Sequence, residues 1–276
     1  EILCQDLIHR FSDEPFDLLQ AYAQRVPIIV ITRLLGVPEA MGDQLLVWSH
    51  AMVGMYQARR TRDDEDKAST AACAFSDFMR SYVDQRRASP ADDLITELIA
   101  AEEAGEKLST DELITTCILL LNAGHEATVH ATGNAVKLML EHGIRDVDDR
   151  LIEETLRFDP PLHLFTRHAY EDVELFGQSF KRGDEVGCLL ASANRDPTFA
   201  ADPDSFDPTR PVRQNASFGA GIHFCVGAPL ARLEMRIALT ALFERCRKLR
   251  LAEPPTYSDS YHFRGLDRLL VTTESA

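Results

Sequence analysis

The sequence is poor in basic residues, and this shortage excludes two classes of partner. Its 276 residues include 29 Lys and Arg against 44 Asp and Glu, which gives a formal net charge of −15. A nucleic-acid-binding face needs clustered positive charge, and electrostatic docking on anionic lipid needs it as well. We therefore expect no nucleic-acid partner and no membrane partner.

The sequence also lacks a long apolar run. The strongest one, residues 26–35, is interrupted by Arg33, whereas a helix that crosses a bilayer needs about 20 predominantly apolar residues. No basic-then-apolar leader opens the chain, so no signal for export is visible. These absences predict a cytoplasmic protein.

Cysteine pairs are absent too. The six cysteines have no Cys-x-x-Cys spacing, and they are Cys4, Cys73, Cys117, Cys188, Cys225 and Cys246. This scatter does not favour a disulfide framework. In a reducing compartment, most of them are expected to be buried, inert thiols. Cys225 is distinguished from the others by its surroundings.

Helical periodicity dominates the first two thirds of the chain, and β-type alternation is confined to the remainder. Helical patterns cover residues 2–11, 17–35 (with a kink or break at Pro27), 39–58, 67–88, 90–104 (capped by Ser89), 109–142, 149–158 and 228–246. Alternation covers residues 163–170, 173–177, 185–190 and 268–273, whereas residues 59–66 and 195–217 have the composition of loops. The expected fold class is mainly α with a minor β part, in one domain.

The segment 109–142 predicts an unusually long helix. Ser109 and Glu112 have the spacing of a capping box. At 1.5 Å per residue, such a helix is about 50 Å long and crosses the whole domain. Its apolar pattern is interrupted in the middle, at Ala123 and Gly124.

The most informative segment is FGAGIHFCVG, residues 218–227. Gly219 and Gly221 permit backbone angles that other residues avoid, so a tight loop can bend around the sulfur of Cys225. The following helix presents unpaired N–H groups and the positive end of its dipole, which favour a thiolate. A thiolate held in this way suits an axial ligand of haem iron.

A glycine-rich turn with a buried cysteine is the alternative interpretation of this segment. The combined match of Phe218, both loop glycines, His223, Cys225 and Gly227 outweighs it. The segment resembles the haem-binding signature F-G-x-G-x-H-x-C-x-G of cytochromes P450. The resemblance implies the cytochrome P450 fold, haem b as cofactor and Cys225 as the iron ligand. It also implies that His223 bonds a haem propionate and that Phe218, Gly219 and Gly227 contribute to the cofactor site.

Two further motifs extend the resemblance. Glu154 and Arg157 match the family's E-x-x-R, which implies a buried structural ion pair with Arg210 as a candidate third member. A solvated helical pair is the alternative. Arg167 matches an arginine that meets a haem propionate, and guanidinium groups suit that role because they bind carboxylates bidentately. A surface arginine on a strand is the alternative.

The oxygen-binding part of the family's long helix corresponds to AGHEAT, residues 123–128. The resemblance implies that Ala123 and Gly124 leave room for dioxygen and that Glu126 relays protons. The family's usual threonine is replaced by Ala127, and Thr128 comes one position later, a helical step of 100° away. Delivery of protons through water from Glu126, through a substrate hydroxyl, or with poor coupling all remain open. We assign no catalytic role to His125.

The resemblance implies a monooxygenase that inserts one oxygen atom of O2 into a small hydrophobic substrate. Its electrons would come from a ferredoxin or flavodoxin with an NAD(P)H-dependent reductase. Basic residues that could dock the carrier, or be structural, are Arg210, Arg213, Arg232 and Arg236. Residues that fall where the family lines its substrate pocket, or that form core, are Leu120, Leu121, Leu162, Leu164, Phe165 and Phe263.

A non-catalytic haem-binding fragment or sensor is the alternative function. Use of peroxide as oxidant lacks support, because Glu126 and Ala127 do not resemble the Arg-Pro pair of peroxide users. The resemblance covers residues 1 to about 273 and begins at what corresponds to the family's fourth helix. We therefore expect residues 1–276 to be a cytochrome P450 domain that is incomplete at its N-terminus.

Overall fold

The computed structural model describes residues 1–57, 59–103, 108–198, 201–260 and 262–273. Residue 58, the end of one predicted helix, and residue 104, the end of another, lie outside the described residues, as do residues 199–200 of the predicted loop. Among the described residues, no helix combines the length and apolar character that crossing a membrane requires.

The fold is mainly helical, as the periodicity predicts. The α-helices are α1 (Ile2–Ile8), α2 (Arg25–Leu35), α3 (Gly42–Val53), α4 (Arg62–Ala88), α5 (Leu94–Glu103), α6 (Thr110–Glu141), α7 (Asp149–Phe158), α8 (Leu190–Ala193) and α9 (Ala228–Arg245). Short helical turns are η1 (Leu19–Ala23, a π-helix), η2 (Glu39–Met41), η3 (Gly54–Tyr56) and η4 (Gly221–His223).

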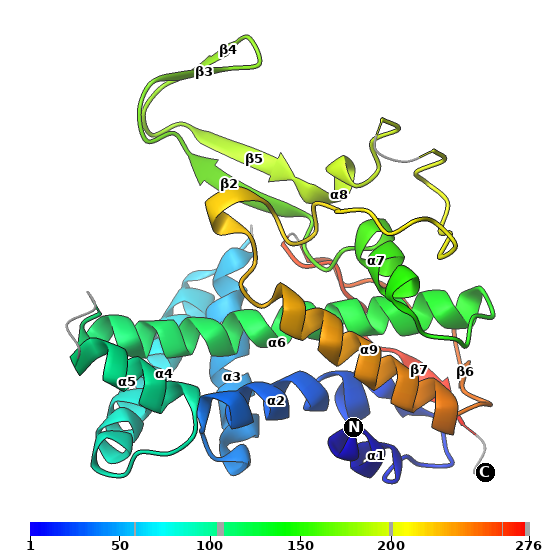
Figure 1. Ribbon diagram of the computed structural model, residues 1–276, viewed down its shortest axis with the longest axis horizontal. Helices are drawn as coiled ribbons and strands as arrows, with labels where there is room; N and C mark the ends of the chain where they lie inside the picture. Colours follow the sequence, from blue (N-terminus) through cyan, green and yellow to red (C-terminus); the bar gives the residue numbers. More distant parts are fainter. Residues whose placement is uncertain (58, 104–107, 199–200, 261, 274–276) are drawn as a thin grey trace.

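Among the described residues, seven short strands form three small antiparallel sheets. They are β1 (Phe16–Asp17), β2 (Leu164–His168), β3 (Val173–Leu175), β4 (Gln178–Phe180), β5 (Glu185–Leu189), β6 (Arg250–Leu251) and β7 (Leu270–Thr272). The sheet orders are β1-β7-β6, β2-β5 and β3-β4. The last two sheets project from the helical part of the molecule (Figure 1). The sequence missed β1, β4 and β6, which are too short for alternation to reveal them.

Helix α6 organises the molecule. It crosses the structure from one side to the other, with α9 packed against its middle (Figure 1). Its first half, including Leu113 and Cys117, belongs to a core shared with α2, α3, α4 and α5. Its second half, including Val129 and Met139, belongs to a core shared with α1, α7 and α9. The two hydrophobic cores therefore meet near the polar residues in the middle of α6.

Two predicted helix starts were wrong because side-chain caps lie elsewhere. Helix α4 begins at Arg62, inside the predicted loop 59–66, since Thr61 and Asp64 form a capping box. Helix α5 begins at Leu94, where the Asp93 carboxylate accepts the Thr96 N–H at 2.9 Å. Ser89 is instead the C-cap of α4.

Two predicted long helices are divided in the structure. The segment 17–35 comprises β1, η1 and α2, and its break precedes Pro27, which lies in the first turn of α2. Proline is tolerated there because the first N–H groups of a helix have no intrahelical partner. The segment 39–58 comprises η2, α3 and η3.

Two predicted helix boundaries have a clear physical basis in the structure. The Ser109–Glu112 capping box begins α6 as predicted. Gly36 ends α2 with φ 82°, the left-handed conformation that favours glycine.

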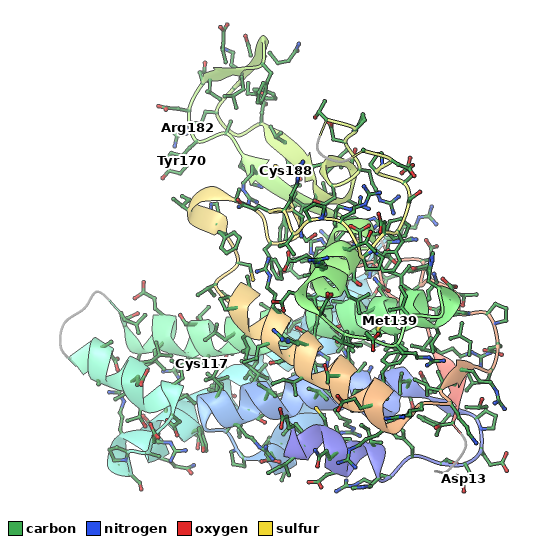
Figure 2. The ribbon with its side chains drawn as sticks, turned by 45° about the vertical axis from the view of Figure 1, so that its right-hand side comes forward. Asp13, Cys117, Met139, Tyr170, Arg182 and Cys188 are labelled. Atoms are coloured by element: carbon green, nitrogen blue, oxygen red, sulfur yellow. The ribbon has the colours of Figure 1, made fainter. Side chains whose placement is uncertain are left out.

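The described cysteines are free thiols, as the absence of paired spacing predicts. Cys117 lies in the helical part and Cys188 on the projecting β2–β5 sheet (Figure 2). Cys4, Cys117 and Cys246 are buried, whereas Cys225 and also Cys73 are exposed.

Candidate functional site

The loop before α9 presents Cys225 on a glycine bend. Gly219 and Gly221 have φ of 69° and 66°, so both occupy the left-handed region that the sequence assigned to glycine. The Cys225 N–H donates to the Phe218 carbonyl at 2.9 Å, which closes the loop. The Cys225 carbonyl accepts the N–H of Ala228, the first residue of α9, at 3.2 Å. The thiol is therefore fixed at the amino end of a helix of 18 residues.

The surroundings of this thiol are exposed and apolar. Ile222 and Val226, on either side of Cys225, are 97% and 85% exposed. On α6, Leu119 is 60% exposed and Ala123, one helical turn later, is exposed as well. Exposed apolar side chains on the cysteine loop and on α6, the helix against which α9 packs, are typical of a binding surface.

The two residues predicted to contact anionic groups are accessible. His223 is exposed in η4, two residues before Cys225. Arg167 lies on β2 opposite Val186 of β5, and its Nη1 donates to the Thr166 carbonyl at 2.8 Å. Neither side chain forms an ion pair with another described residue. Both can therefore donate hydrogen bonds to a carboxylate.

Glu154 and Arg157 form a buried, bidentate ion pair on α7. Each residue is 4% exposed. Arg157 Nε donates to Glu154 Oε2 at 2.7 Å, and Nη2 donates to Oε1 at 2.8 Å. The remaining donors of Arg157 bind the carbonyls of Asn194, Pro203 and Ser205. The buried arrangement agrees with the structural role implied by the resemblance rather than with a solvated pair.

Arg210 joins this pair, as the sequence suggested. Its Nε lies 3.4 Å from Glu154 Oε1. The same oxygen accepts the Asp207 N–H at 2.9 Å. A buried charge pair is stable only when its polar atoms form hydrogen bonds. Here the irregular segment that leads to the Cys225 loop supplies those bonds, so the pair holds this segment in place.

Two of the other basic residues near α9 bind carboxylates of this chain. Arg232 pairs with Glu153, and its guanidinium lies 4.4 Å from the centre of the Phe218 ring. Arg236 pairs with Asp149 at 2.8 Å, and the side chains of both residues are more than half exposed. For Arg232, these contacts favour the structural alternative, since they hold the aromatic residue of the cysteine loop.

Glu126 lies at the centre of a histidine cluster in the middle of α6. His50 Nε2, from α3, lies 2.9 Å from Glu126 Oε1. His130 Nε2 lies 3.5 Å from Oε2, and His125 Nδ1 lies 3.9 Å from Oε1. The sequence identified Glu126 but missed the contributions of His50 and His130. His130 has the i,i+4 spacing that brings two side chains together on a helix, whereas no local signal pairs His50 with α6.

The protonation of this cluster follows from burial and hydrogen bonding. Burial raises the pKa of Glu126, but hydrogen bonds from His130 and His50 outweigh it and hold the pKa well below its usual range. The hydrogen bond to Glu126 raises the pKa of His50. Burial lowers the pKa of His125 to about 4, so this imidazole is neutral at pH 7.

Thr128 lies on the buried side of α6. It is 7% exposed, and its Oγ1 donates to the Gly124 carbonyl at 3.2 Å. Ala127 is half-buried. The Thr128 hydroxyl is therefore hydrogen-bonded to the backbone of its own helix, beside the small residues Ala123 and Gly124.

Some residues assigned to the substrate pocket lie in contact with one another. Leu162 and Phe263 are joined by an antiparallel bridge, and the Phe263 ring lies 5.5 Å from that of His130. Phe165 packs edge-on against His262 at 5.5 Å. Leu121, in contrast, is 2% exposed and belongs to the core, so the core alternative holds for it.

Comparisons with known proteins agree with this geometry. The family model for cytochrome P450 matches residues 147–260. The chain is 37% identical over 285 residues to the polyketide biosynthesis cytochrome P450 PksS of Bacillus subtilis, covering 99% of this chain and 69% of that protein. It is 33% identical over 283 residues to a biotin biosynthesis cytochrome P450 of the same organism, covering 98% and 71%.

A solved structure shares both fold and sequence. The crystal structure of P450BioI in complex with an acyl carrier protein ligated to hexadec-9Z-enoic acid has a TM-score of 0.93 and 33% identity. The alignment covers 99% of this chain and 73% of that one. The similarity therefore extends over nearly the whole of this chain.

Proposed function

Since the chain belongs to the cytochrome P450 family, whose members bind haem b and act as monooxygenases, we propose that it inserts one oxygen atom of O2 into a small hydrophobic substrate. The observation that carries this proposal is the exposed Cys225, fixed on its glycine bend at the amino end of α9. The electrons come from a ferredoxin or flavodoxin with an NAD(P)H-dependent reductase.

The residues around Cys225 fit haem b. The thiolate of Cys225 would hold the haem iron, while His223 and Arg167 would hold the propionates. The exposed residue Ala123 is small enough to leave space on α6 for a planar apolar group. Gly124 faces α2 instead, since a Cβ on it would lie 3.5 Å from the Ile31 side chain. Phe218, Gly219 and Gly227 complete the cofactor site, and a Cβ on Gly227 would lie 3.8 Å from the Cys225 sulfur. Bound haem supplies the redox-active iron at which dioxygen is activated.

Glu126 and Thr128 supply protons on the α6 side of the site. His50 Nε2 lies 2.9 Å from Glu126 Oε1, so a proton can pass between this imidazole and the carboxylate. His50, whose side chain is 47% exposed, connects this carboxylate to solvent. Thr128 holds the Gly124 carbonyl, and this bond is broken when its hydroxyl takes part in transfer.

The substrate is apolar, because the residues available to contact it are apolar. Leu120, Phe165 and Phe263 are partly accessible and come from α6, β2 and the segment before β7. The relatives whose names indicate polyketide and biotin biosynthesis act in the synthesis of different products. We infer that the apolar contacts select size and shape rather than a particular polar group.

The electron carrier approaches the face that carries the Cys225 loop. Ile222 and Val226 supply exposed apolar contact area. Arg236 is the basic residue best placed for an acidic carrier, because its pair with Asp149 is exposed and can be exchanged. Arg210 and Arg232 are held by partly or fully buried carboxylates.

The decisive experiment replaces the iron ligand. Cys225→Ser is expected to abolish the absorption band that marks thiolate ligation in the reduced, carbon monoxide-bound protein. Cys73→Ser removes the other exposed thiol and is expected to leave the band unchanged. An unaltered spectrum in Cys225→Ser would overturn the proposal.

A non-catalytic haem-binding protein or sensor is the second candidate, and Ala127 at the usual threonine position favours it. Product analysis distinguishes the two candidates. A monooxygenase releases hydroxylated product when a ferredoxin, its reductase and NAD(P)H are supplied, whereas a sensor binds haem and releases none.

A further inference from the structure

The histidine cluster around Glu126 has the composition of a transition-metal site. One ligand atom from each of His50, His125 and Glu126 lies within 4.8 Å of the others. Two imidazoles and one carboxylate form a common donor set for Zn²⁺. The ligands come from two separate elements, α3 and α6, which are packed against each other.

The environment of His125 is a second, independent observation that indicates a bound ligand. His125 is 1% exposed, and neither of its ring nitrogens has a hydrogen-bond partner among the described residues. A buried polar group without a partner destabilises the folded state, because it has lost its hydrogen bonds to water. Because Nδ1 lies 3.9 Å from Glu126 Oε1, the unpartnered imidazole faces the same carboxylate as His50.

His130 fixes the orientation of the carboxylate. Its Nε2 contacts Oε2 at 3.5 Å, whereas His50 and His125 both face Oε1. The ring is held on its other side, since a Cβ on Gly265 would lie only 1.7 Å from His130 Nδ1. A metal-binding carboxylate is commonly oriented in this way by a hydrogen bond to its second oxygen.

From this geometry we propose that His50, His125 and Glu126 bind Zn²⁺ in an open, three-residue site. Ligand atoms 2.0–2.1 Å from a tetrahedral zinc ion lie roughly 3.3 Å from one another. The distances to Glu126 Oε1, 2.9 Å from His50 and 3.9 Å from His125, lie on either side of that value. Small rotations of the side chains bring them to it, and the partly exposed His50 provides a path for the ion to enter.

The site has a consequence for catalysis that rests on the proposed function. Glu126 Oε1 cannot bind zinc and carry a proton at the same time. Zinc is therefore an inhibitor of oxygenation, acting on the α6 side and away from the thiolate of Cys225.

Zinc binding is tested on the haem-loaded protein, in which the Cys225 sulfur is expected to bind iron and is therefore not available to zinc. Equilibrium dialysis with radioactive Zn²⁺ is expected to give one ion per chain. X-ray absorption at the zinc edge is expected to show nitrogen and oxygen neighbours at about 2.0–2.1 Å and no sulfur at about 2.3 Å.

Two variants test the assignment of ligands. His50→Gln keeps a hydrogen-bond donor to Glu126, and His125→Leu replaces a buried polar ring by an apolar side chain. Each is expected to weaken zinc binding by at least about 100-fold, since loss of an outer-shell partner alone costs 10- to 100-fold. His9→Gln, which changes the exposed C-cap residue of α1, is the matched control and is expected to bind zinc like the parent.

Zinc bound as tightly by His50→Gln as by the parent would overturn the proposal, and so would a sulfur neighbour in the absorption spectrum. His50 is half-exposed, so its variant remains informative even if His125→Leu fails to fold. Haem-free Cys225→Ser protein is expected to bind zinc equally well. Failure of zinc binding is thereby distinguished from failure of the proposed haem-dependent function.

Discussion

At the scale of single residues, Glu234 introduces an unusual pH dependence. This residue of α9 is 8% exposed, and its Oε2 has no hydrogen-bond partner among the described residues. Burial raises the pKa of Glu234 to about 7. Between pH 4.5 and 7, the folded protein therefore binds this proton while the unfolded chain releases it, so folding stability falls as pH rises through this window.

Replacement of Glu234 by Gln removes this loss. Between pH 5 and pH 8, the free energy of unfolding of the variant is expected to rise by up to about 3 kcal/mol relative to that of the parent. Urea unfolding at both pH values measures the difference. The lowered pKa of His125 makes the folded state less stable as pH falls below about 6.5. Because His125 is present in both parent and variant, its contribution cancels and the difference reports Glu234. Glu185→Gln, at an exposed carboxylate of β5, is the control and should show no such change.

Glu126 is the second residue whose chemistry can be isolated. Glu126→Gln keeps the size of the side chain but cannot carry a proton at Oε1. We expect the rate of product formation to fall by about 10²-fold, the scale typical of one proton-transferring side chain. Product formed per NAD(P)H consumed should fall as well. A variant with normal rate and normal product yield would remove Glu126 from proton delivery.

Thr128→Val accompanies that experiment because it removes the hydroxyl that bonds the Gly124 carbonyl. A matching fall in product yield assigns Thr128 to the same pathway. An unchanged yield would favour delivery through water or through a substrate hydroxyl.

At the scale of elements, α7 is locked to the irregular segment that follows β5 and α8. Arg157→Met leaves Glu154 buried without its main partner and removes donors from three carbonyls. The expected loss of stability is about 3–5 kcal/mol, measured by urea unfolding. Arg236→Ala breaks an exposed ion pair and should change stability by about 1 kcal/mol or less. Equal losses in the two variants would contradict a structural role for the buried pair.

At the start of α6, a substitution in the capping box is expected to have a smaller effect on stability. Ser109 Oγ accepts the Glu112 N–H at 3.3 Å, and the Glu112 carboxylate accepts the Ser109 N–H at 2.7 Å. Ser109→Ala removes one half of this capping box and is expected to cost about 1 kcal/mol. A lower midpoint of thermal unfolding with an unchanged far-ultraviolet spectrum would confirm it.

At the scale of the whole molecule, α6 joins two hydrophobic cores while α9 carries the cysteine loop against it. Haem binding between these elements is therefore expected to stabilise both cores together. A ligand at 100 times its dissociation constant adds about 2.7 kcal/mol to the stability of the folded state. Haem loading should raise the midpoint of thermal unfolding in the parent and in Cys73→Ser. It should raise the midpoint much less in Cys225→Ser.

The expectation that residues 1–276 form a cytochrome P450 domain that is incomplete at its N-terminus stays a prediction. The chain spans 69% and 71% of the two Bacillus relatives described above. The described residues nevertheless include the cysteine loop, the buried ion pair and the acidic residue of α6.

Features of the fold that depend on neighbouring residues could be predicted from the amino-acid sequence. Gly219 and Gly221 adopt positive φ because the bend around Cys225 is local, and the Ser109 cap begins α6 for the same reason. The spacing of Glu154 and Arg157 on one helical face also follows from the chain alone.

Contacts between residues that are distant in the sequence could not be predicted in this way. Packing of α3 on α6 brings His50 to Glu126, and the return of the irregular segment brings Arg210 to Glu154. No local pattern encodes such pairs, because each depends on how whole helices pack through their apolar faces. The polar centre of α6 is therefore evident as a sequence anomaly, but its place between two cores and among three histidines is a property of the folded chain.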